Sequence, residues 1–325
     1  MSRLGRCSWP SETSLDGRII QGVRQGLALV ERPFLELANQ LEISESRLLG
    51  RLQEMKSRQL LSFIGPIYFA EAFGRGLSLL TMAVPEADLE RVSQILIQHP
   101  QVVHLSSCRH HFNLWFTLTA SGLAAKERLH QQLQAETGYP IVHLYSLQEF
   151  YQGQRVQPNQ EPAATVLSDF DWRLIAITEQ GMPLVSEPYR TLALQLSISQ
   201  DELLVRLERL REGGILLRVA GVPNYCRAGY RASGISVWDI EDAALYPLGE
   251  AIASLPLVSQ CSLRPRQPGW PYNLLVVVHG RSRGEVRHQV EEIAKMSNGS
   301  LHAHDLVFRA HMGKKTRHWP IQGIL

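Results

Sequence analysis

The chain contains two copies of one unit, and this internal repeat limits the possible folds more than any other feature of the sequence. When Asp16 is aligned with Asp171, a shift of 155 residues, Gly26 also falls on Gly181. The same shift, without a gap, matches Val30, Pro33, Leu37, Ala38, Leu41, Ile43, Ser44, Arg51 and Leu52 with Val185, Pro188, Leu192, Ala193, Leu196, Ile198, Ser199, Arg206 and Leu207. So many matches do not arise by chance, and the chain is therefore a tandem duplication.

The repeat predicts a first copy at residues 1–151 and a second copy at residues 169–325. Residues 152–168 between them are rich in Gln, Pro, Asn and Ala, which is typical of a linker. Further along, Asn113 meets Asn273 at a shift of 160 residues, so the second copy has about five extra residues before that point.

The first part of each copy, residues 15–65 and 169–220, predicts a winged helix-turn-helix. Pro33 suits the first turn of a helix, and Phe34, Leu37, Ala38 and Leu41 form one helical face. Ser44 and Ser199 can cap a third helix. Residues 60–64 and 215–219 then predict a short strand, which we expect to be a wing.

The second part of each copy, residues 75–150 and 230–310, alternates strand and helix patterns in the order β-α-β-β-α-β. This order is typical of a ferredoxin-like domain. The fold class is therefore α+β, a tandem repeat of a winged helix-turn-helix followed by a ferredoxin-like domain. Because such domains often form dimers, we expect the two halves to make an intramolecular pseudo-dimer, to which a further homodimer could be added.

Composition excludes several classes of protein. The net charge is +2, so the chain as a whole has no strong attraction to nucleic acid or to a membrane surface. No apolar run reaches the roughly 18–20 residues that span a bilayer, and the first ten residues lack the apolar core of a secretory signal. We therefore expect no membrane association and a cytoplasmic location. The four cysteines form no C-x-x-C pair, so neither a zinc site nor a disulfide framework is indicated.

The predicted recognition helices argue against DNA binding. Residues 44–58 carry a net charge of +2, but the corresponding residues 199–213 carry −1. A two-fold symmetric DNA-binding protein needs two basic helices that resemble each other. DNA is therefore an unlikely partner, although the domain order resembles the Lrp/AsnC transcription regulators.

Two stretches stand out as candidates for chemistry, Arg109–Phe116 in the first copy and Gly269–Leu274 in the second. Both place an aromatic residue, Asn and Leu at the start of an apolar strand, with cationic side chains just before it. Adjacent side chains on a strand point to opposite faces, so His110 and His111 cannot both face one site. We expect the fold to bring the two stretches together.

In combination with two further motifs, these stretches resemble the siroheme decarboxylases, Lrp/AsnC-like proteins of tetrapyrrole biosynthesis that occur as two related subunits or as one fused chain. The further motifs are the connection Gly26–Phe34, repeated as Gly181–Tyr189, and the basic, aromatic segment Lys314–Trp319. The resemblance covers nearly the whole chain. It implies removal of the C12 and C18 acetate carboxylates of siroheme, giving 12,18-didecarboxysiroheme for heme d1 or for an alternative route to heme.

The residue types suit that chemistry. A flat, carboxylate-edged ring needs an aromatic slot with a cationic rim, and Arg grips carboxylates through two hydrogen bonds. An imidazole titrates near neutrality and can supply the proton that replaces carbon dioxide. The conjugated ring itself accepts the electron pair, so no cofactor beyond the iron-bearing substrate is required.

The resemblance and this chemistry together assign the candidate residues. Catalytic roles go to His110, His279 and Arg109, and His110 is also a candidate ligand of the substrate iron. Substrate contacts are predicted for His111, Trp115, Arg264, Arg266, Trp270, Tyr272, Asn273, Lys314, Lys315, Arg317 and His318.

Two alternatives remain open on the sequence, an Lrp/AsnC-type DNA-binding regulator and a non-catalytic tetrapyrrole carrier. The first copy differs from the second at its end, because Tyr151–Arg155 keeps only Arg155 of the basic character found in residues 314–318. We therefore expect one productive site, formed where the two halves meet.

Overall fold

The computed structural model describes residues 13–68, 78–120, 123–151, 154–156, 167–178, 181–225, 230–308 and 310–313. The chain forms two compact units, and each unit takes one domain from each copy. Met1–Phe69 and Pro158–Arg231 form a helix-turn-helix unit, whereas Ala70–Gln157 and Ala232–Leu325 form a sheet unit. The element order confirms the predicted α+β class and the repeated pair of domains. No helix in the described ranges has the length and hydropathy needed to cross a bilayer.

Within the described residues, each half of the helix-turn-helix unit contains three helices. Serine hydroxyls accept hydrogen bonds from backbone N–H groups at the starts of three of these helices. The N···O distances are 3.1 Å for Ser14, 3.3 Å for Ser44 and 3.2 Å for Ser199. The helices are α1 (Leu15–Gln25), α2 (Pro33–Gln40), α3 (Glu45–Ser57), α6 (Asp169–Thr178), α7 (Pro188–Leu196) and α8 (Gln200–Glu212).

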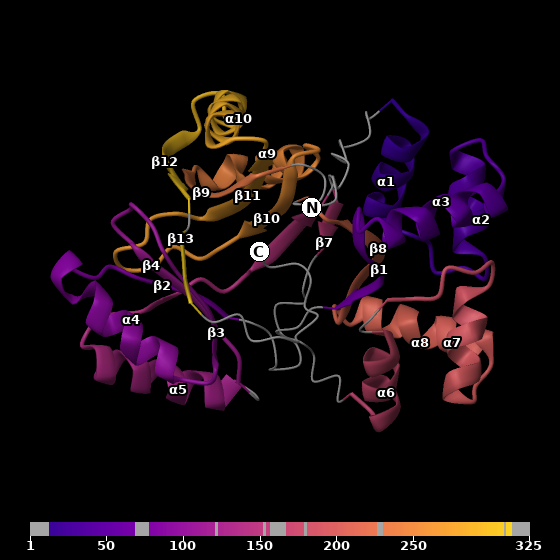
Figure 1. Ribbon diagram of the computed structural model, residues 1–325, viewed down its shortest axis with the longest axis horizontal. Helices are drawn as coiled ribbons and strands as arrows, with labels where there is room; N and C mark the ends of the chain where they lie inside the picture. The colour runs from indigo at the N-terminus through magenta and orange to yellow at the C-terminus, as the bar shows by residue number, and fades with distance from the viewer. Residues whose placement is uncertain are drawn as a thin grey trace, which may run out of the picture. The chain divides into compact units, whose positions relative to one another are not determined.

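The strand after the third helix pairs with its counterpart in the other copy. β1 (Leu61–Tyr68) and β8 (Leu216–Pro223) form a two-stranded antiparallel sheet and lie side by side in Figure 1. The expectation that each strand is a wing of its own domain was therefore wrong. A single strand leaves its backbone N–H and C=O groups unpaired, and pairing across the copies satisfies them.

The same cross-copy pairing explains the repeated glycines Gly26 and Gly181, whose φ angles are +124° and +101°. After each glycine, the next N–H donates to a strand of the other copy, Leu27 to Val219 O at 2.7 Å and Met182 to Ile64 O at 2.8 Å. A Cβ on Gly181 would lie 2.8 Å from the Ile64 oxygen. Glycine is therefore required at this close approach.

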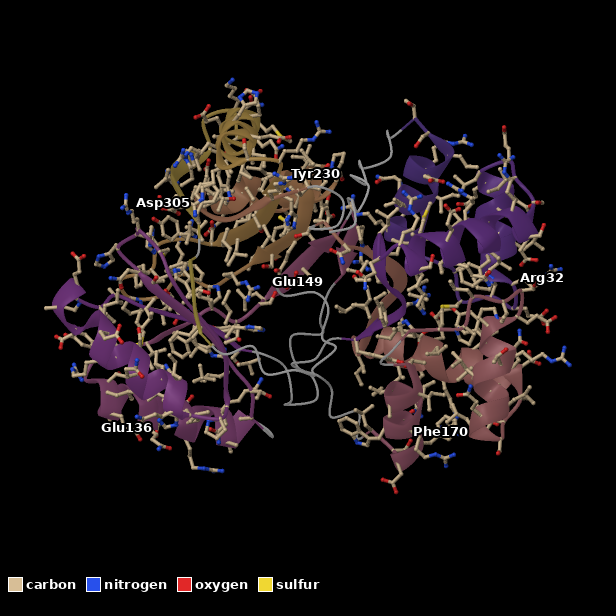
Figure 2. All side chains as sticks on the ribbon, viewed as in Figure 1. Arg32, Glu136, Glu149, Phe170, Tyr230 and Asp305 are labelled. Carbon is tan, nitrogen blue, oxygen red and sulfur yellow. The ribbon has the colours of Figure 1, made fainter. Side chains whose placement is uncertain are left out.

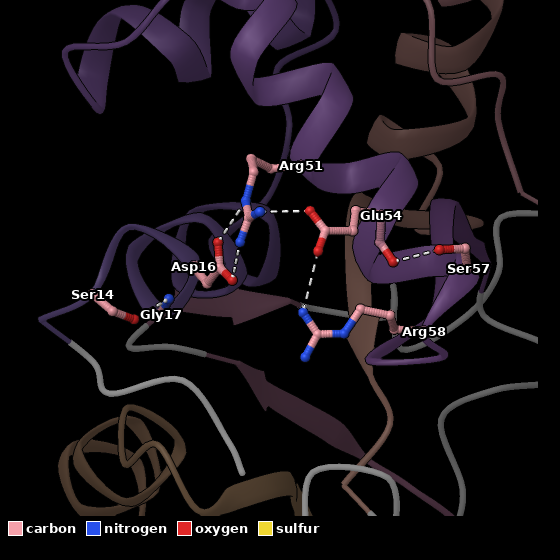
Figure 3. A network of polar contacts seen from close by, with 7 residues as sticks. All are labelled: Ser14, Asp16, Gly17, Arg51, Glu54, Ser57 and Arg58. Atoms are coloured by element: carbon pink, nitrogen blue, oxygen red, sulfur yellow. Dashed lines mark hydrogen bonds and ion pairs between the residues drawn. The ribbon is translucent and has the colours of Figure 1, made fainter. Parts of the chain in front are cut away.

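Ion pairs within the helix-turn-helix unit engage many of the arginines of α3 and α8. Figure 3 shows that Arg51 bonds to Asp16 and to Glu54, and that Glu54 also bonds to Arg58. In the second copy, Arg206 and Arg211 pair with glutamates on α8, and Arg209 pairs with Asp171. These internal partners lower the positive charge that α3 and α8 could offer to DNA phosphates.

The sheet unit contains two ferredoxin-like domains. In the first, β2 (Ser78–Met82), α4 (Leu89–Gln98), β3 (Val102–Ser107), β4 (Leu114–Leu118), α5 (Leu123–Thr137) and β5 (Val142–His143) follow one another, with a short 3₁₀ helix at Glu86–Asp88. The second contains β9 (Ala232–Ile240), α9 (Asp242–Ala253), β10 (Val258–Leu263), β11 (Leu274–Gly280), α10 (Arg283–Met296) and β12 (Leu301–Val307).

Short strands at the ends of the copies cross over to the opposite sheet. β6 (Gln148–Tyr151) from the first copy pairs with β10, and β7 (Gln154–Val156) pairs with β6. β13 (Ala310–Gly313) from the second copy pairs with β3. Thus β7 begins within the predicted linker 152–168, most of which lies outside the described residues. Each sheet is completed by a segment of the other copy.

The central strands are buried on both faces. On β4, Leu114 and Phe116 pack in one core with residues of α4 and α5. Trp115 between them points the other way, into a cluster that also holds Leu275 and Val277 of β11. Side chains alternate across a strand, so one strand serves a helix-facing core and a core shared by the two sheets.

Substituting Arg209 by Ala should destabilise the helix-turn-helix unit. The Asp171 carboxylate is fully buried and accepts from Arg209 Nη2 at 2.9 Å and from the Ser168 hydroxyl at 2.7 Å. Without Arg209 this buried charge loses its cation, which should lower the free energy of unfolding by about 1–3 kcal/mol. Urea unfolding measures the change. The control Arg211→Ala, which breaks an exposed pair with Glu208, should cost at most about 0.5 kcal/mol. Equal losses in the two variants would contradict this role.

Candidate active site

The two stretches singled out in the sequence meet in one aromatic cluster. The ring of Trp270, from the β10–β11 connection, lies 5.0 Å from the ring of Phe112 and 5.9 Å from that of Trp115 in the first copy. Tyr272 packs on Trp270 at 5.0 Å. Edge-to-face contacts of this kind hold aromatic rings in fixed orientations. The cluster therefore joins the β3–β4 connection of one copy to the β10–β11 connection of the other.

His110 lies at the border of this cluster and is almost covered, with 5% of its side chain exposed. Its ring stacks on Phe112 at 6.0 Å and lies 6.5 Å from Tyr272. The Phe112 N–H donates to His110 Nδ1 at 3.0 Å. On the other side of the ring, Nε2 is 3.1 Å from a carboxylate oxygen of Asp305 on β12, a residue labelled in Figure 2. Both ring nitrogens thus have partners, one from each copy.

Arg109 and His111 flank His110 and are exposed. Arg109 makes no ion pair with the residues that the structure describes. The ring of His111 packs edge-on against Phe112 at 4.9 Å. The guanidinium group of Arg109 and the imidazole of His111 therefore lie beside the aromatic cluster and are open to solvent, where a charged ligand can reach them.

The two tryptophans of the cluster are each 1% exposed. Trp115 Nε1 donates to the Phe112 carbonyl at 2.8 Å. Trp270 Nε1 is buried and has no acceptor among the described residues. A buried donor without an acceptor costs about 1–3 kcal/mol. An acceptor for the Trp270 N–H would therefore stabilise this part of the protein, and the described residues do not supply one.

Tyr272 is partly buried, and its environment favours the protonated phenol. Burial raises the pKa of Tyr272, and the carboxylates of Asp305 and Asp239 raise the pKa further. The phenol therefore remains a hydrogen-bond donor across the neutral pH range.

Arg264 and Arg266, which we expected to bind carboxylates, have partners within the sheet unit. Arg264 is 3% exposed and donates to the Leu144 carbonyl and to the Ser262 hydroxyl, the latter at 3.0 Å. Arg266 bonds to Asp239 at 2.7 Å and lowers the pKa of the Asp242 carboxyl group, to which it donates at 2.6 Å. Direct substrate contact by either arginine stays a prediction.

The Asn273 side chain links the start of β11 to the end of β9 through two hydrogen bonds. Its amide accepts from Ile240 N at 2.9 Å and donates to Ile240 O at 2.7 Å. Asn113 makes the same pair of bonds to Val84, at 3.0 and 2.7 Å. The repeated asparagine therefore has a structural task in both copies, and a substrate contact by Asn273 stays a prediction.

His279 lies at the far end of β11 from the aromatic cluster, and its catalytic role stays a prediction. β11 runs from Leu274 to Gly280, so His279 lies five residues beyond Leu274, or about 17 Å along the strand. It is 7% exposed, and its Nε2 is 2.7 Å from the Ser259 hydroxyl. His279 and the segment Trp270–Asn273 thus lie at opposite ends of β11.

Four predicted substrate contacts, Lys314, Lys315, Arg317 and His318, lie outside the described residues. The sequence reasoning also missed Asp305 and left Phe112 out of the candidate residues. An aromatic residue directly after His110 and His111 could have indicated Phe112, whereas nothing near Asp305 in the sequence marks it. In the described part of the chain, no group of three or more His, Cys, Asp and Glu side chains is placed to hold a metal ion.

Comparisons with known proteins cover nearly the whole chain. Residues 16–61 and 171–216 match the siroheme decarboxylase NirDL-like helix-turn-helix domain, and residues 73–151 and 227–307 match the AsnC-like ligand-binding domain. The siroheme decarboxylase of Hydrogenobacter thermophilus is 30% identical over 92% of this chain and 93% of its own. The NirDL subunit of siroheme decarboxylase from Paracoccus denitrificans is 27% identical over 90% of this chain and 93% of its own.

Solved structures agree with these relatives. The crystal structure of the siroheme decarboxylase NirDL superposes with a TM-score of 0.65 at 26% identity, covering 95% of this chain and 96% of that one. A second crystal structure of NirDL, in complex with an iron-uroporphyrin III analogue, superposes with a TM-score of 0.62 at 27% identity, covering 91% of this chain and 90% of that one.

The fold and the family models define a protein with two copies of an AsnC-like ligand-binding domain, each preceded by its own helix-turn-helix domain. The similarity over nearly the full length narrows this class further. The chain belongs to the siroheme decarboxylase family.

Substituting His143 by Gln should make the sheet unit less sensitive to acid. Burial lowers the pKa of His143 to about 4, and the positive charges of His130, Lys126 and Arg264 contribute. The unfolded chain therefore binds more protons between about pH 4 and pH 6.5, so stability falls as the pH drops through this window. The loss in the wild type should reach roughly 2–3 kcal/mol near pH 4.

Denaturant unfolding at pH 4.5 and pH 7 measures this effect. The difference in unfolding free energy between the two pH values should be smaller in His143→Gln than in the wild type. The control His288→Gln, at an exposed position of α10, should behave as the wild type does. An unchanged pH dependence in His143→Gln would show that the neutral state of His143 contributes nothing.

Proposed function

We propose that this protein is a siroheme decarboxylase that removes the carboxylates of the C12 and C18 acetate side chains, giving 12,18-didecarboxysiroheme. Family membership over nearly the full chain supports the reaction class. The observation that carries the assignment of a site is the joint aromatic cluster of Phe112, Trp115, Trp270 and Tyr272, which draws on both copies. The macrocycle would bind beside this buried cluster, where Tyr272 is partly exposed and the exposed Arg109 and His111 suit its carboxylates.

In the proposed reaction, the bond between the acetate methylene carbon and the carboxylate carbon breaks, and carbon dioxide leaves. The electron pair stays on the methylene carbon and spreads into the conjugated ring, so we propose that no further cofactor is needed. A proton must then be added to that carbon to make the methyl group. We assign this proton to the imidazolium form of His110, which is left as the neutral ring. We assign binding of the carboxylates to Arg109 and His111 at the exposed border of the cluster.

The siroheme conversion itself tests the proposed reaction. Incubating the full chain with siroheme under anaerobic conditions should yield a product that has lost two molecules of carbon dioxide, as measured by mass spectrometry. Siroheme that is bound but unchanged would contradict the reaction and favour a tetrapyrrole carrier. Absence of siroheme binding, together with salt-sensitive binding of a DNA duplex, would contradict it and favour a regulator.

Substituting His110 by Ala should lower kcat for this conversion by roughly a hundredfold or more, because general acid catalysis contributes about 10²–10⁴-fold. The control His288→Ala, on the surface of α10, should keep the wild-type rate. Circular dichroism of both variants checks that the fold is retained. A His110→Ala protein that is folded and fully active would remove His110 from the reaction.

A further inference from the structure

Asp305 of the second copy holds one ring nitrogen of His110 of the first copy. The carboxylate oxygen lies 3.1 Å from Nε2, in a contact that joins β12 to the β3–β4 connection. The His110 side chain is 5% exposed, whereas the Asp305 side chain is 50% exposed. The carboxylate is therefore the solvent-facing member of the pair, and a ligand that approaches Nε2 must displace it.

The other ring nitrogen determines where the proton of the neutral ring resides. His110 Nδ1 lies 3.0 Å from the Phe112 N–H, a group that can only donate. The Phe112 carbonyl, 3.3 Å from Nδ1, already accepts from Trp115 Nε1 at 2.8 Å and from Cys108 Sγ at 3.3 Å. Nδ1 is therefore best satisfied as an acceptor, which leaves the proton on Nε2, facing Asp305.

We propose that Asp305 is a positioning residue that keeps the proton of neutral His110 on Nε2 and closes this nitrogen to the substrate iron. The inference rests on the proposed function, because it concerns how His110 serves that reaction. A metal needs a bare nitrogen, and in this arrangement Nδ1 is committed to the Phe112 amide while Nε2 carries a hydrogen. In this neutral form His110 donates a hydrogen bond from Nε2 and does not act as an axial ligand.

The pair also explains why the site needs both copies. His110 belongs to the first copy and Asp305 to the second, and Tyr272 of the second copy lies 6.5 Å from the His110 ring. Two carboxylates, Asp305 and Asp239, raise the pKa of Tyr272. Asp239 is paired with Arg266. Among the charged groups of the described residues, Asp305 is thus the carboxylate placed on His110.

The tautomer of His110 in the free protein tests the proposal without any substrate. Long-range proton–nitrogen NMR spectra at a pH where the ring is neutral should show the Nε2–H form in the wild type. Asp305→Asn should keep this form, because the amide oxygen can still accept. Asp305→Ala should lose it in part or entirely. An Nδ1–H ring in the wild type, or an unchanged tautomer in Asp305→Ala, would overturn the proposal. This readout does not depend on whether siroheme is the substrate.

The reaction gives a second, independent readout. Asp305→Ala should lower kcat for siroheme roughly ten- to a hundredfold, as loss of a partner that orients a histidine does, with little change in KM. Asp305→Asn should recover part of that loss. The control His302→Ala, an exposed position on the same strand, should keep both constants. A change confined to KM, or equal rates in Asp305→Ala and the wild type, would contradict a positioning role.

Spectroscopy of the siroheme complex tests the statement about iron. If Asp305 closes Nε2, electron paramagnetic resonance and absorption spectra of bound siroheme should be the same in the wild type and in His110→Ala. An imidazole–iron signature that is present in the wild type and absent from His110→Ala would overturn the proposal. Loss of decarboxylation with an intact Nε2–H tautomer would instead overturn the proposed function alone.

Discussion

Backbone hydrogen bonds that cross from one copy to the other are the interaction on which the rest of the structure depends. β1 pairs with β8, β6 with β10 and β13 with β3, and each pair joins strands from different copies. Backbone polar groups that are buried without a partner are costly. Neither copy could satisfy these strands alone, so the duplication is built into the hydrogen bonding of both units.

This exchange makes two sheets share one core, and the shared core sets the position of the site. Trp115 of β4 and Leu275 of β11 belong to the same buried cluster, and the connections that precede these strands bring Phe112 and Trp270 into contact. The two connections are not equivalent in sequence. A single chain with two diverged halves can therefore place different groups around one site, which a symmetric dimer cannot do.

The sequence predicted the helices and strands well because their signals are local. The periodicity of apolar residues, the serine caps and the repeat located the helices and the main strands of both copies, but not the short strands β6, β7 and β13. Partners across the copies have no local signal. Arg264 donates to the Leu144 carbonyl and Arg266 donates to Asp239. In the sequence, however, both arginines resemble unpaired loop cations. The pairing of strand β1 with β8, in place of the expected wing, could not be predicted for the same reason.

The separation of His279 from the segment Trp270–Asn273 could have been foreseen from strand length alone. A strand advances about 3.3 Å per residue, so His279 lies about 17 Å along β11 from Leu274. Asp305 could not have been foreseen, because its significance comes from the packing of β12 against the other copy.

The groups around the aromatic cluster are ordered by charge and exposure, and this order has a chemical consequence. Arg109 and His111 are exposed, whereas the His110 ring is covered and the partly buried Tyr272 keeps its phenolic proton because burial and two carboxylates raise its pKa. A polyanionic ring would meet the exposed cations first, which neutralise its carboxylates at little desolvation cost. Beside the buried cluster it would then meet the phenol of Tyr272, which stays protonated, and the covered ring of His110. Different residues thus attract the substrate and hold a proton in place. His110 is covered because a ring that holds its proton in one direction must be shielded from solvent.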